Sequence, residues 1–439
     1  MMTRRNLLIG GAGLGASLVL AGAAAAQNAV DARAFGLEEG TGDQSHALQM
    51  AIDAAIGLRQ PLALGAGVFE AKDVRITGPL TIRGSGQTVL RLAGGDTLLS
   101  VLDCDGVVLE ALSLEANAQS GMETALLAMA GASRFTIRDC HFAHAGIGIK
   151  AHGSQGRIEN CWFSDIADTA IFSTDSGGLD IEGNSITGCG NGGIRIWRSE
   201  SGPDGSRIFG NRIGAIDWKG GGNGQNGNGI NIFRADGVSI ADNSIADCAF
   251  SAIRLNATND TRIIGNHCVR SGEVSIFSEF GFSGSIISDN LIEGGAAGIS
   301  MTNFDRNGRL SICKGNIVRN LAKGSLTNPG VVPYGIAAEA DAAIVGNIVE
   351  AVPGTGIVVG WGPYLRDVLV SDNLVRGCEM GIVVSLAPGA GHARISGNIV
   401  SGSVRHAIVG ARWDDIVSTD LAADADAYDT LAITDNSVF

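Results

Sequence analysis

The chain has 439 residues and a formal net charge of −14 at pH 7. This acidic balance argues against nucleic acid as a partner, because phosphate binding needs clustered Lys and Arg side chains. Its 65 glycines weaken helices, so a mainly helical fold is disfavoured.

Residues 1–26 form a predicted export signal. Residues 3–8 (TRRNLL) are a twin-arginine motif, a weakly hydrophobic stretch follows, and residues 24–26 (AAA) offer a cleavage site. The apolar run is too short for a membrane anchor and ends in a cleavable pattern. We therefore expect the twin-arginine translocase to carry the chain to the periplasm or out of the cell. Residues 27–439 are then one domain without membrane contact once the signal is removed.

An amphipathic helix is predicted over residues 43–57. Asp43 can cap its start and Gly57 can end it. We expect it to close the N-terminal end of the stacked repeats that follow, because an open end would expose apolar core and unpaired strand edges. Its apolar face consists of Ala47, Leu48, Ala51, Ile52, Ala55 and Ile56.

A six-residue phrase recurs every 21 to 38 positions from Ile137 to Val438. It reads apolar, any, Gly/Asp/Asn, Asn, any, apolar, as in residues 181–186 (IEGNSI). Asn is also common in simple turns, but its amide donates and accepts, so Asn stacked over Asn predicts a hydrogen-bonded ladder. The ladder residues are Asn184, Asn211, Asn243, Asn266, Asn290, Asn316, Asn347, Asn373, Asn398 and Asn436, with Cys140 and Cys161 in the same place in the two preceding copies.

A second phrase, Gly-Ile-x-Ile or a close variant, lies between successive Asn phrases, as at residues 193–196 and 356–359. Both phrases alternate apolar with other residues, which is strand periodicity, and Ile and Val dominate the apolar places. Each repeat is therefore predicted to be one coil of short strands. Stacking the coils buries an interior that one coil cannot bury alone.

The outward places of the Gly-Ile-x-Ile strands carry the strongest functional pattern. The middle coils collect Arg, Asn, aromatic and carboxylate side chains there, whereas the last coils carry small or apolar ones. Aromatic faces suit sugar rings, and Arg and Asn suit hydroxyl and carboxylate groups. The predicted substrate-binding residues are Arg195, Trp197, Asn231, Phe233, Asn256 and Phe277, with Trp218 from an adjoining loop.

Two insertions lengthen the loops that lead into these strands. The first insertion, residues 214–228, contains Asp217, Trp218 and Lys219, and the second insertion, residues 319–334, ends in Pro333-Tyr334. Insertions in solenoids gather on one face, which is often the binding face. We therefore expect both to border the same site.

Histidines and cysteines suggest no resident metal or cofactor. His141, His144 and His152 lie near several Asp residues, but they lack a repeated ligand spacing, which favours exposed histidines over a metal site. The eight cysteines show no CxxC spacing. They are predicted to be small buried hydrophobes without disulfides.

The end of the chain leaves two interpretations open. Val358, Val383 and Val409 are predicted to form an apolar patch on the last coils. We expect residues 410–432, with Trp413 and Tyr428, to cover this patch as a C-terminal cap, because solenoid ends need one; the alternative is that the patch is free for a partner protein.

The repeats resemble the pectate-lyase-like superfamily of right-handed parallel β-helices over roughly residues 31–439. The opening supports this, since Phe35-Gly36 and residues 40–43 (GTGD) precede the predicted helix. With the twin-arginine motif, the chain also resembles an uncharacterised family of twin-arginine-translocated repeat proteins. The resemblance implies an all-β fold: a right-handed single-stranded parallel β-helix over residues 27–439, with an N-terminal capping helix.

Lyases and epimerases of that superfamily use a cation to neutralise the substrate carboxylate while a base removes the neighbouring proton. By analogy, Arg195 and Arg254 would be the cations, and Lys219 or Glu279 the base. Hydrolases of the superfamily pair aspartates instead. No such aspartate cluster occurs on the predicted sheet.

The predicted function is binding of an acidic or neutral polysaccharide along the central sheet. Whether the chain also cleaves or epimerises that polysaccharide, as a lyase, uronate epimerase or glycoside hydrolase, stays open. The alternative is a non-catalytic cell-envelope or extracellular scaffold that binds another protein. In that case the Arg and Glu side chains of the sheet form only solvated pairs between coils.

Overall fold

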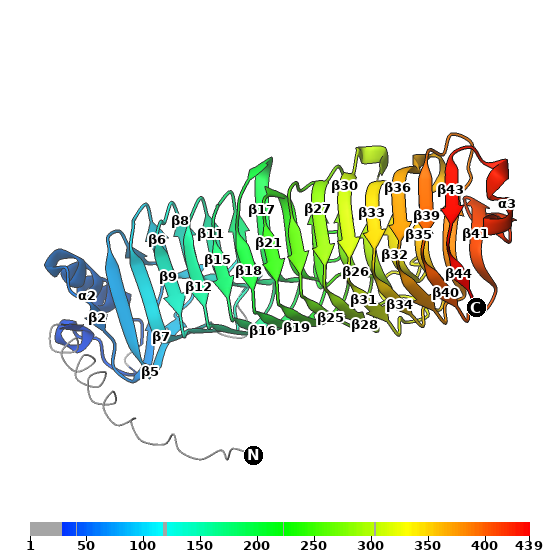
Figure 1. Ribbon diagram of the computed structural model, residues 1–439. Coiled ribbons are helices and arrows are strands. Elements are labelled where there is room, and N and C mark those ends of the chain that lie inside the picture. Colours follow the sequence, from blue (N-terminus) through cyan, green and yellow to red (C-terminus); the bar gives the residue numbers. More distant parts are fainter. Residues whose placement is uncertain (1–28, 41, 117–120, 223, 303) are drawn as a thin grey trace, which may run out of the picture.

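The computed structural model describes residues 29–40, 42–116, 121–222, 224–302 and 304–439. The predicted twin-arginine signal, residues 1–26, lies outside the described residues. The described chain winds into an elongated rod of stacked coils, with helix α2 at one end and α3 at the other (Figure 1). This confirms the predicted right-handed parallel β-helix with an N-terminal capping helix.

Each coil has three faces. In one coil, β12 (Gly156–Glu159) and β13 (Trp162–Ile166) belong to a 29-stranded sheet, sheet A, and β14 (Thr169–Thr174) belongs to a 15-stranded sheet, sheet B. Strands pair in parallel with the equivalent strands one coil earlier and one coil later. Sheet A therefore supplies two faces of the rod, and sheet B supplies the third.

Sheet B is parallel except for its last strand, β42, which runs antiparallel to β41. Its strands are β4 (Val74–Ile76), β6 (Thr97–Leu102), β8 (Ala125–Ala130), β11 (Ile147–His152), β14 (Thr169–Thr174), β17 (Gly192–Pro203), β20 (Asn228–Asp236), β23 (Ile253–Asn256), β26 (Val274–Glu279), β29 (Ala297–Met301), β32 (Tyr334–Ala338), β35 (Thr355–Val359), β38 (Met380–Ser385), β41 (His406–Arg412) and β42 (Asp415–Ser418).

Sheet A begins with short strands beside helix α2. Its strands are β1 (Val30–Asp31), β2 (Leu62–Ala63), β3 (Gly67–Ala71), β5 (Leu80–Leu92), β7 (Val107–Glu115), β9 (Phe135–Arg138), β10 (His141–Ala143), β12, β13, β15 (Asp180–Glu182), β16 (Ser185–Cys189), β18 (Arg207–Phe209), β19 (Arg212–Ile216), β21 (Ser239–Ala241), β22 (Ser244–Cys248), β24 (Arg262–Ile264), β25 (His267–Val269), β27 (Ser283–Ser288), β28 (Leu291–Glu293), β30 (Arg309–Lys314), β31 (Ile317–Arg319), β33 (Ala340–Val345), β34 (Ile348–Glu350), β36 (Arg366–Ser371), β37 (Leu374–Arg376), β39 (Ala393–Ser396), β40 (Ile399–Ser401), β43 (Leu431–Thr434) and β44 (Ser437–Val438).

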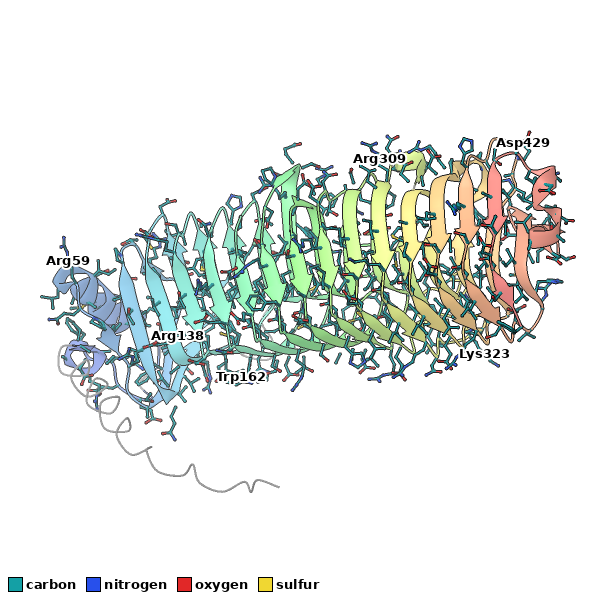
Figure 2. The ribbon with its side chains drawn as sticks, in the orientation of Figure 1. Arg59, Arg138, Trp162, Arg309, Lys323 and Asp429 are labelled. Carbon is teal, nitrogen blue, oxygen red and sulfur yellow. The ribbon has the colours of Figure 1, made fainter. Side chains whose placement is uncertain are left out.

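The core consists of apolar side chains aligned from coil to coil. Ile194, Ile230 and Ile253 occupy one register of sheet B, and the same register continues through the later coils. All three are fully buried. Because each coil buries its Ile against the next, the stack provides the burial that an isolated coil lacks. Polar and charged side chains cover the outside of the rod (Figure 2).

The predicted asparagine ladder is confirmed. Through all ten asparagines, each side-chain Nδ2 donates to Oδ1 of the next at 2.9–3.0 Å. Each Oδ1 also accepts the backbone N–H of the preceding ladder residue, as from Asn184 to Asn211 at 2.9 Å. The remaining Nδ2 proton goes to a backbone carbonyl, for example from Asn211 to Ile181 at 2.9 Å. Interior amides of the ladder are thus buried with their hydrogen bonds made.

Helix α2 (Ser45–Leu58) covers the N-terminal end with Leu48, Ala51, Ile52 and Ala55 buried. Its bounds differ slightly from the predicted 43–57. Asp43 lies before the helix and accepts from the Ser45 N–H at 3.0 Å, whereas Gln44 occupies the N-cap position. The helix passes through Gly57 and ends at Leu58, and the C-cap residue Arg59 takes the left-handed conformation itself.

At the other end, β42 and helix α3 (Leu421–Asp424) lie within the predicted cap, residues 410–432. Leu421 is fully buried, and its side chain and that of Leu386 both lie close to Gly410 of β41.

The eight cysteines are free and buried. Burial raises the pKa of Cys189 and of Cys268 to about 12. Among the described residues, none of the helices combines the length and the apolar character needed to span a membrane.

Candidate functional site

The structure brings most of the predicted site residues into two adjacent columns on the outer face of sheet B. Strand pairing aligns Arg195, Asn231, Arg254 and Phe277 in one register. The same pairing aligns a second set of residues in a neighbouring register. These are Trp197, Phe233, Asn256 and Glu279. Two predicted residues, Trp218 and Lys219, lie elsewhere.

The charged members of these columns are not solvated, contrary to the simple outward-facing expectation. Arg195 is only 4% exposed, Arg254 6% and Glu279 2%. The cause is tertiary, because the two insertions fold back over sheet B and form hydrogen bonds with this charged layer. The pairs between coils are therefore buried, and breaking them carries a desolvation cost that solvated pairs do not have.

Arg195 helps to hold the first insertion. One guanidinium nitrogen donates to Asn226 Oδ1 at 2.6 Å, and another lies 3.4 Å from Asp168 Oδ1. The guanidinium also sits 5.3 Å from the Trp197 ring centre. Burial lowers the pKa of Arg195, with Asp168 acting in the opposite direction. The Nε atom is buried without a hydrogen-bond partner among the described residues.

Arg254 is enclosed by two carboxylates. Its Nε and Nη2 donate to the two oxygens of Glu279 at 2.7 and 2.9 Å, and Nη1 donates to Glu273 at 2.7 Å. The second oxygen of Glu273 accepts from Asn328 Nδ2, in the second insertion, at 2.8 Å. Burial raises the pKa of Glu273, and Arg254 opposes that rise. In this arrangement the charge of Arg254 is already balanced and is not offered to an anionic substrate.

The predicted aromatic residues pack mainly on one another. Trp197 meets Phe233 edge to face, with ring centres 6.1 Å apart, and its indole N–H donates to Asn231 Oδ1 at 2.6 Å. Asn256 donates to Glu279 at 3.2 Å. These contacts use the polar groups that the sequence pattern had suggested for a ligand.

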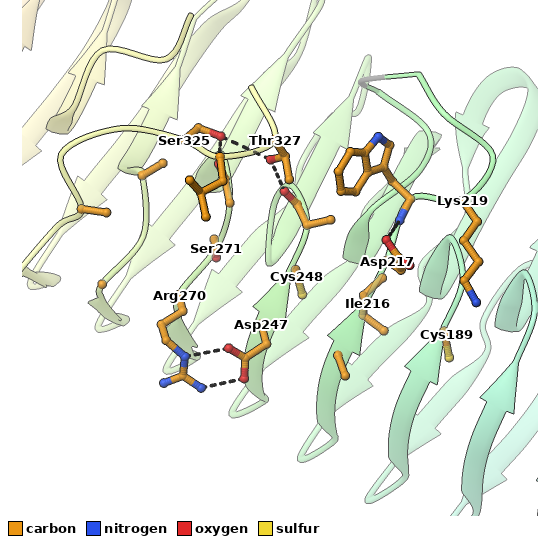
Figure 3. A pocket seen from close by; sticks show the side chains of 18 of the residues that line it. Cys189, Ile216, Asp217, Lys219, Asp247, Cys248, Arg270, Ser271, Ser325 and Thr327 are labelled. Carbon is orange, nitrogen blue, oxygen red and sulfur yellow. Dashed lines mark hydrogen bonds and ion pairs between the residues drawn. The ribbon is translucent and has the colours of Figure 1, made fainter. Parts of the chain in front are cut away.

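Trp218 and Lys219 line a separate hollow, the loop groove, of about 760 Å³ at the corner between sheets A and B (Figure 3). The ring of Trp218 packs edge to face on Phe250 with centres 5.8 Å apart. The opposite rim is the second insertion, where the Thr327 hydroxyl donates to the Ala249 carbonyl at 2.5 Å. Neither Arg254 nor Glu279 lines the loop groove, so Lys219 does not share a hollow with them.

The outer face of sheet B carries a second hollow, the sheet groove, of about 670 Å³ over β26 to β41. Its floor is the continuation of the Arg254 column, where the side chains become small or apolar. One wall is the end of the second insertion, residues 330–334, and another contains Trp361 and Trp413. The floor residues include Ala337, Val358, Met380 and Val383.

The two tryptophans form an exposed aromatic wall. Their ring centres are 5.5 Å apart at 79°, and Trp361 and Trp413 remain 40% and 47% exposed. Gly362 permits this contact, because a Cβ at that position would lie 2.3 Å from the Trp413 ring. Of the predicted apolar patch, Val358 and Val383 line the groove, whereas Val409 is buried. Sequence reasoning found part of the groove floor but missed its aromatic side, for which the signal was a tryptophan just after each of two strands.

Polar groups surround this apolar floor. Asp414 and Asp415 line the groove from the turn between β41 and β42, are exposed, and form no ion pair or side-chain hydrogen bond within the described residues. Thr355 is 8% exposed and lines the groove, and its hydroxyl has no hydrogen-bond partner in the described chain. Burial raises the pKa of Tyr334 to about 12, opposed by a hydrogen bond with Ser300.

His141 and His152 contact separate hydroxyl groups. His141 Nε2 lies 3.1 Å from the Ser164 hydroxyl, and His152 Nδ1 lies 3.1 Å from that of Thr174. Burial lowers the pKa of His141. In the described parts of the chain, no group of three or more His, Cys, Asp or Glu side chains is arranged to hold a metal ion.

Comparisons with known proteins agree with the architecture. Residues 91–223 match the family described as right handed beta helix region, and no curated protein matches the chain. The catalytic unit of the Streptomyces thermodiastaticus GH87 α-1,3-glucanase is 14% identical with a TM-score of 0.51, over 88% of this chain and 69% of that one.

Two further structures have lower TM-scores. The Azotobacter vinelandii mannuronan C-5 epimerase AlgE6 A-module is 13% identical with a TM-score of 0.43, over 93% of this chain and 99% of that one. Geobacillus virus E2 ORF18 is 13% identical with a TM-score of 0.46. That match covers 64% of this chain and 59% of the viral protein. At these identities the likeness concerns the fold alone.

Proposed function

We propose that this right-handed β-helix binds a polysaccharide along the outer face of sheet B, after export by the twin-arginine pathway to the periplasm or beyond. The sheet groove is the observation that carries the binding proposal. It is a hollow with an apolar floor, an exposed wall of Trp361 and Trp413, and, at its edge, Asp414 and Asp415, which form no ion pair within the described residues. Sugar rings have apolar faces and hydroxyl edges, which such a surface complements.

The geometry supports binding more strongly than cleavage. A lyase or epimerase needs an available cation beside the substrate carboxylate. Arg254 is held by Glu273 and Glu279, and Arg195 is buried under the first insertion. The catalytic assignment of Arg254, Glu279 and Lys219 therefore stays a prediction that requires the second insertion to move away from sheet B.

The decisive experiment passes the purified protein over immobilised polysaccharides and incubates it with the same set in solution. Unsaturated-product absorbance and new reducing ends are followed together, so that a lyase and a hydrolase give different signals. We expect retention on at least one polysaccharide. Retention without product in either channel supports a binding protein, and product in one channel identifies the reaction class.

A pair of matched variants locates the site. Trp361→Ala with Trp413→Ala removes the aromatic wall, and we expect a loss of affinity of roughly tenfold or more from lost stacking. Trp162→Ala removes a tryptophan that is 53% exposed on β13 of sheet A (Figure 2) and should leave affinity unchanged. If no polysaccharide is retained and both product channels stay silent, the scaffold alternative takes the place of this proposal.

A further inference from the structure

We infer that the sheet groove selects a glycan with free amines, such as a chain of unacetylated hexosamine units, over a uronate-containing one. This inference rests on the proposed function and names the substrate class of the same site. A glycan with amines carries positive charge, whereas the sequence pattern of Arg195 and Arg254 had suggested an acidic substrate.

The groove is built to hold a ring. Its floor of Ala337, Val358 and Val383 is flat and apolar because these residues occupy the same register in consecutive coils. The indole rings of Trp361 and Trp413 meet at 79°, so they present surfaces in two directions to an occupant of the groove. A pyranose ring seated on such a surface buries its apolar face and directs its substituents toward the edges.

The charge at the edges is negative. Glu273, Glu339, Asp414 and Asp415 line the groove, and Arg405 is the single basic residue among its described lining. Glu273 shares Arg254 with Glu279, and Arg405 lies 3.4 Å from Glu379 on the exposed surface. The two aspartates form no ion pair among the described residues, although Arg412 is the cross-strand neighbour of Asp415 and lies outside the groove lining. An anionic sugar would meet like charge here, whereas an ammonium group would meet opposite charge.

The aspartates and the tryptophan lie together. Asp414 and Asp415 directly follow Trp413 in the turn between β41 and β42. Arg412 precedes Trp413 but does not line the groove. An amine on a ring stacked against Trp413 would thus lie near two carboxylates and near an indole face, which also attracts cations. The open hydroxyl of Thr355 offers a further donor or acceptor to ring hydroxyls.

The test compares three hexasaccharides by calorimetric titration of the whole protein. β-1,4-linked glucosamine and N-acetylglucosamine hexamers share a backbone and differ in charge, and a galacturonate hexamer supplies the opposite charge. We expect the glucosamine hexamer to bind roughly tenfold or more tightly than its acetylated counterpart at low salt, since two exposed charge contacts are gained. This preference should shrink as salt is added.

Variants separate recognition in the groove from general attraction to an acidic protein. Asp414→Asn with Asp415→Asn should abolish the preference for glucosamine and leave the affinity for the N-acetylglucosamine hexamer within about twofold. Asp73→Asn with Asp96→Asn removes the same charge from two exposed residues of the N-terminal coils and should keep the preference. Trp413→Ala should weaken both hexamers.

The outcomes distinguish this inference from the function on which it rests. Equal affinity for both amino-sugar hexamers, tighter binding of galacturonate, or an equal effect of the two double variants overturns the inference while polysaccharide binding stands. Failure of all three hexamers to bind also overturns it. Retention of the protein on the other immobilised polysaccharides then decides whether the proposed polysaccharide binding is also overturned.

Discussion

At the scale of single residues, the buried charges of sheet B decide how much the predicted site can do. Arg254 contacts two carboxylates through three nitrogen atoms, and each of these side chains is at most 8% exposed. Removing one partner from such a group leaves uncompensated charge in a place that water does not reach. The arginines therefore contribute to stability and to loop placement first, whatever ligand the face binds.

Arg254→Met is expected to lower the free energy of unfolding by roughly 3–5 kcal/mol, because Glu273 and Glu279 stay buried without their cation. Urea unfolding measures this loss. Arg270→Met is the matched control, since Arg270 pairs with Asp247 at 2.6 Å but both side chains are more than half exposed. That variant should lose less than about 1 kcal/mol. Similar losses in the two variants would contradict the buried-network interpretation.

The same network predicts a pH dependence. Burial raises the pKa of Glu273, so the folded chain holds this proton more tightly than the unfolded chain. The contribution of Glu273 to stability is therefore present in acid and is lost as the pH rises through the raised pKa. Without Arg254 the opposing cation is gone and the pKa rises further. The deficit of Arg254→Met should thus be larger at about pH 7.5 than at about pH 5, and a deficit that is constant with pH would exclude this cause.

Asn290 and Asn436 test what a ladder position contributes. Asn290 is buried and accepts two bonds from Asn266 while it donates to Asn316 and Ile263. Asn290→Ala should lower the free energy of unfolding by roughly 3–5 kcal/mol, because several buried groups lose their partner. Asn436→Ala, at the half-exposed last position, should cost about 1 kcal/mol, since water replaces the lost bonds. Equal losses of unfolding free energy in the two variants would show that the ladder hydrogen bonds add little to the preference of Asn for turns.

At the scale of elements, the second insertion connects the two grooves. Ser325, Thr327 and Asn328 form hydrogen bonds with Gly272, Ala249 and Glu273, which belong to earlier coils. The next residues of the insertion form a wall of the sheet groove. The first insertion lines only the loop groove. The expectation that both insertions border one site therefore holds in part.

Loosening the second insertion should be visible without unfolding the rod. Thr327→Val with Asn328→Ala removes two side-chain hydrogen bonds, so hydrogen exchange in residues 319–334 should accelerate roughly tenfold or more. Peptides from residues 181–213 serve as the internal control and should exchange as before. Unchanged exchange in the insertion would mean that its backbone contacts alone hold it.

At the scale of the whole molecule, export and fold are connected through the proposed route. The twin-arginine pathway carries folded chains, and this chain buries all eight thiols without a disulfide. Its fold therefore does not depend on an oxidising compartment. The stacked coils also give it a continuous outer sheet that suits an extended polymer more than a small molecule.

Replacing Arg4 and Arg5 by Lys tests the route, because the motif is read through the arginine pair. We expect the full-length precursor to accumulate inside the cell and the periplasmic or secreted form to disappear, as followed by cell fractionation and immunoblotting. A variant with Lys at Arg33 and Arg59, which lie beyond the predicted signal, should be exported normally. Export of the Arg4 and Arg5 variant would remove the support for this route.

The architecture of this protein can be read from its repeats alone. The spacing of the ten asparagines and the Gly-Ile-x-Ile phrases specified the coil, the register and the inward residues, since a period-two pattern repeated at one register permits only stacked strands. The two columns of Arg195, Asn231, Arg254 and their neighbours could also be read in this way. Local periodicity is encoded within each repeat, so no distant contact is needed to recover it.

The surroundings of those residues depend instead on the folded chain. The insertions fold over earlier coils, with Thr327 reaching Ala249, and such long-range contacts leave no periodic trace in the sequence. They bury Arg195 and Arg254 and leave the open surface farther along, where Trp361, after β35, meets Trp413, after β41. Burial and charge balance depend on which loop covers which strand. The proposed binding site therefore lies at the apolar end of sheet B, whereas the sequence pattern had suggested its charged middle.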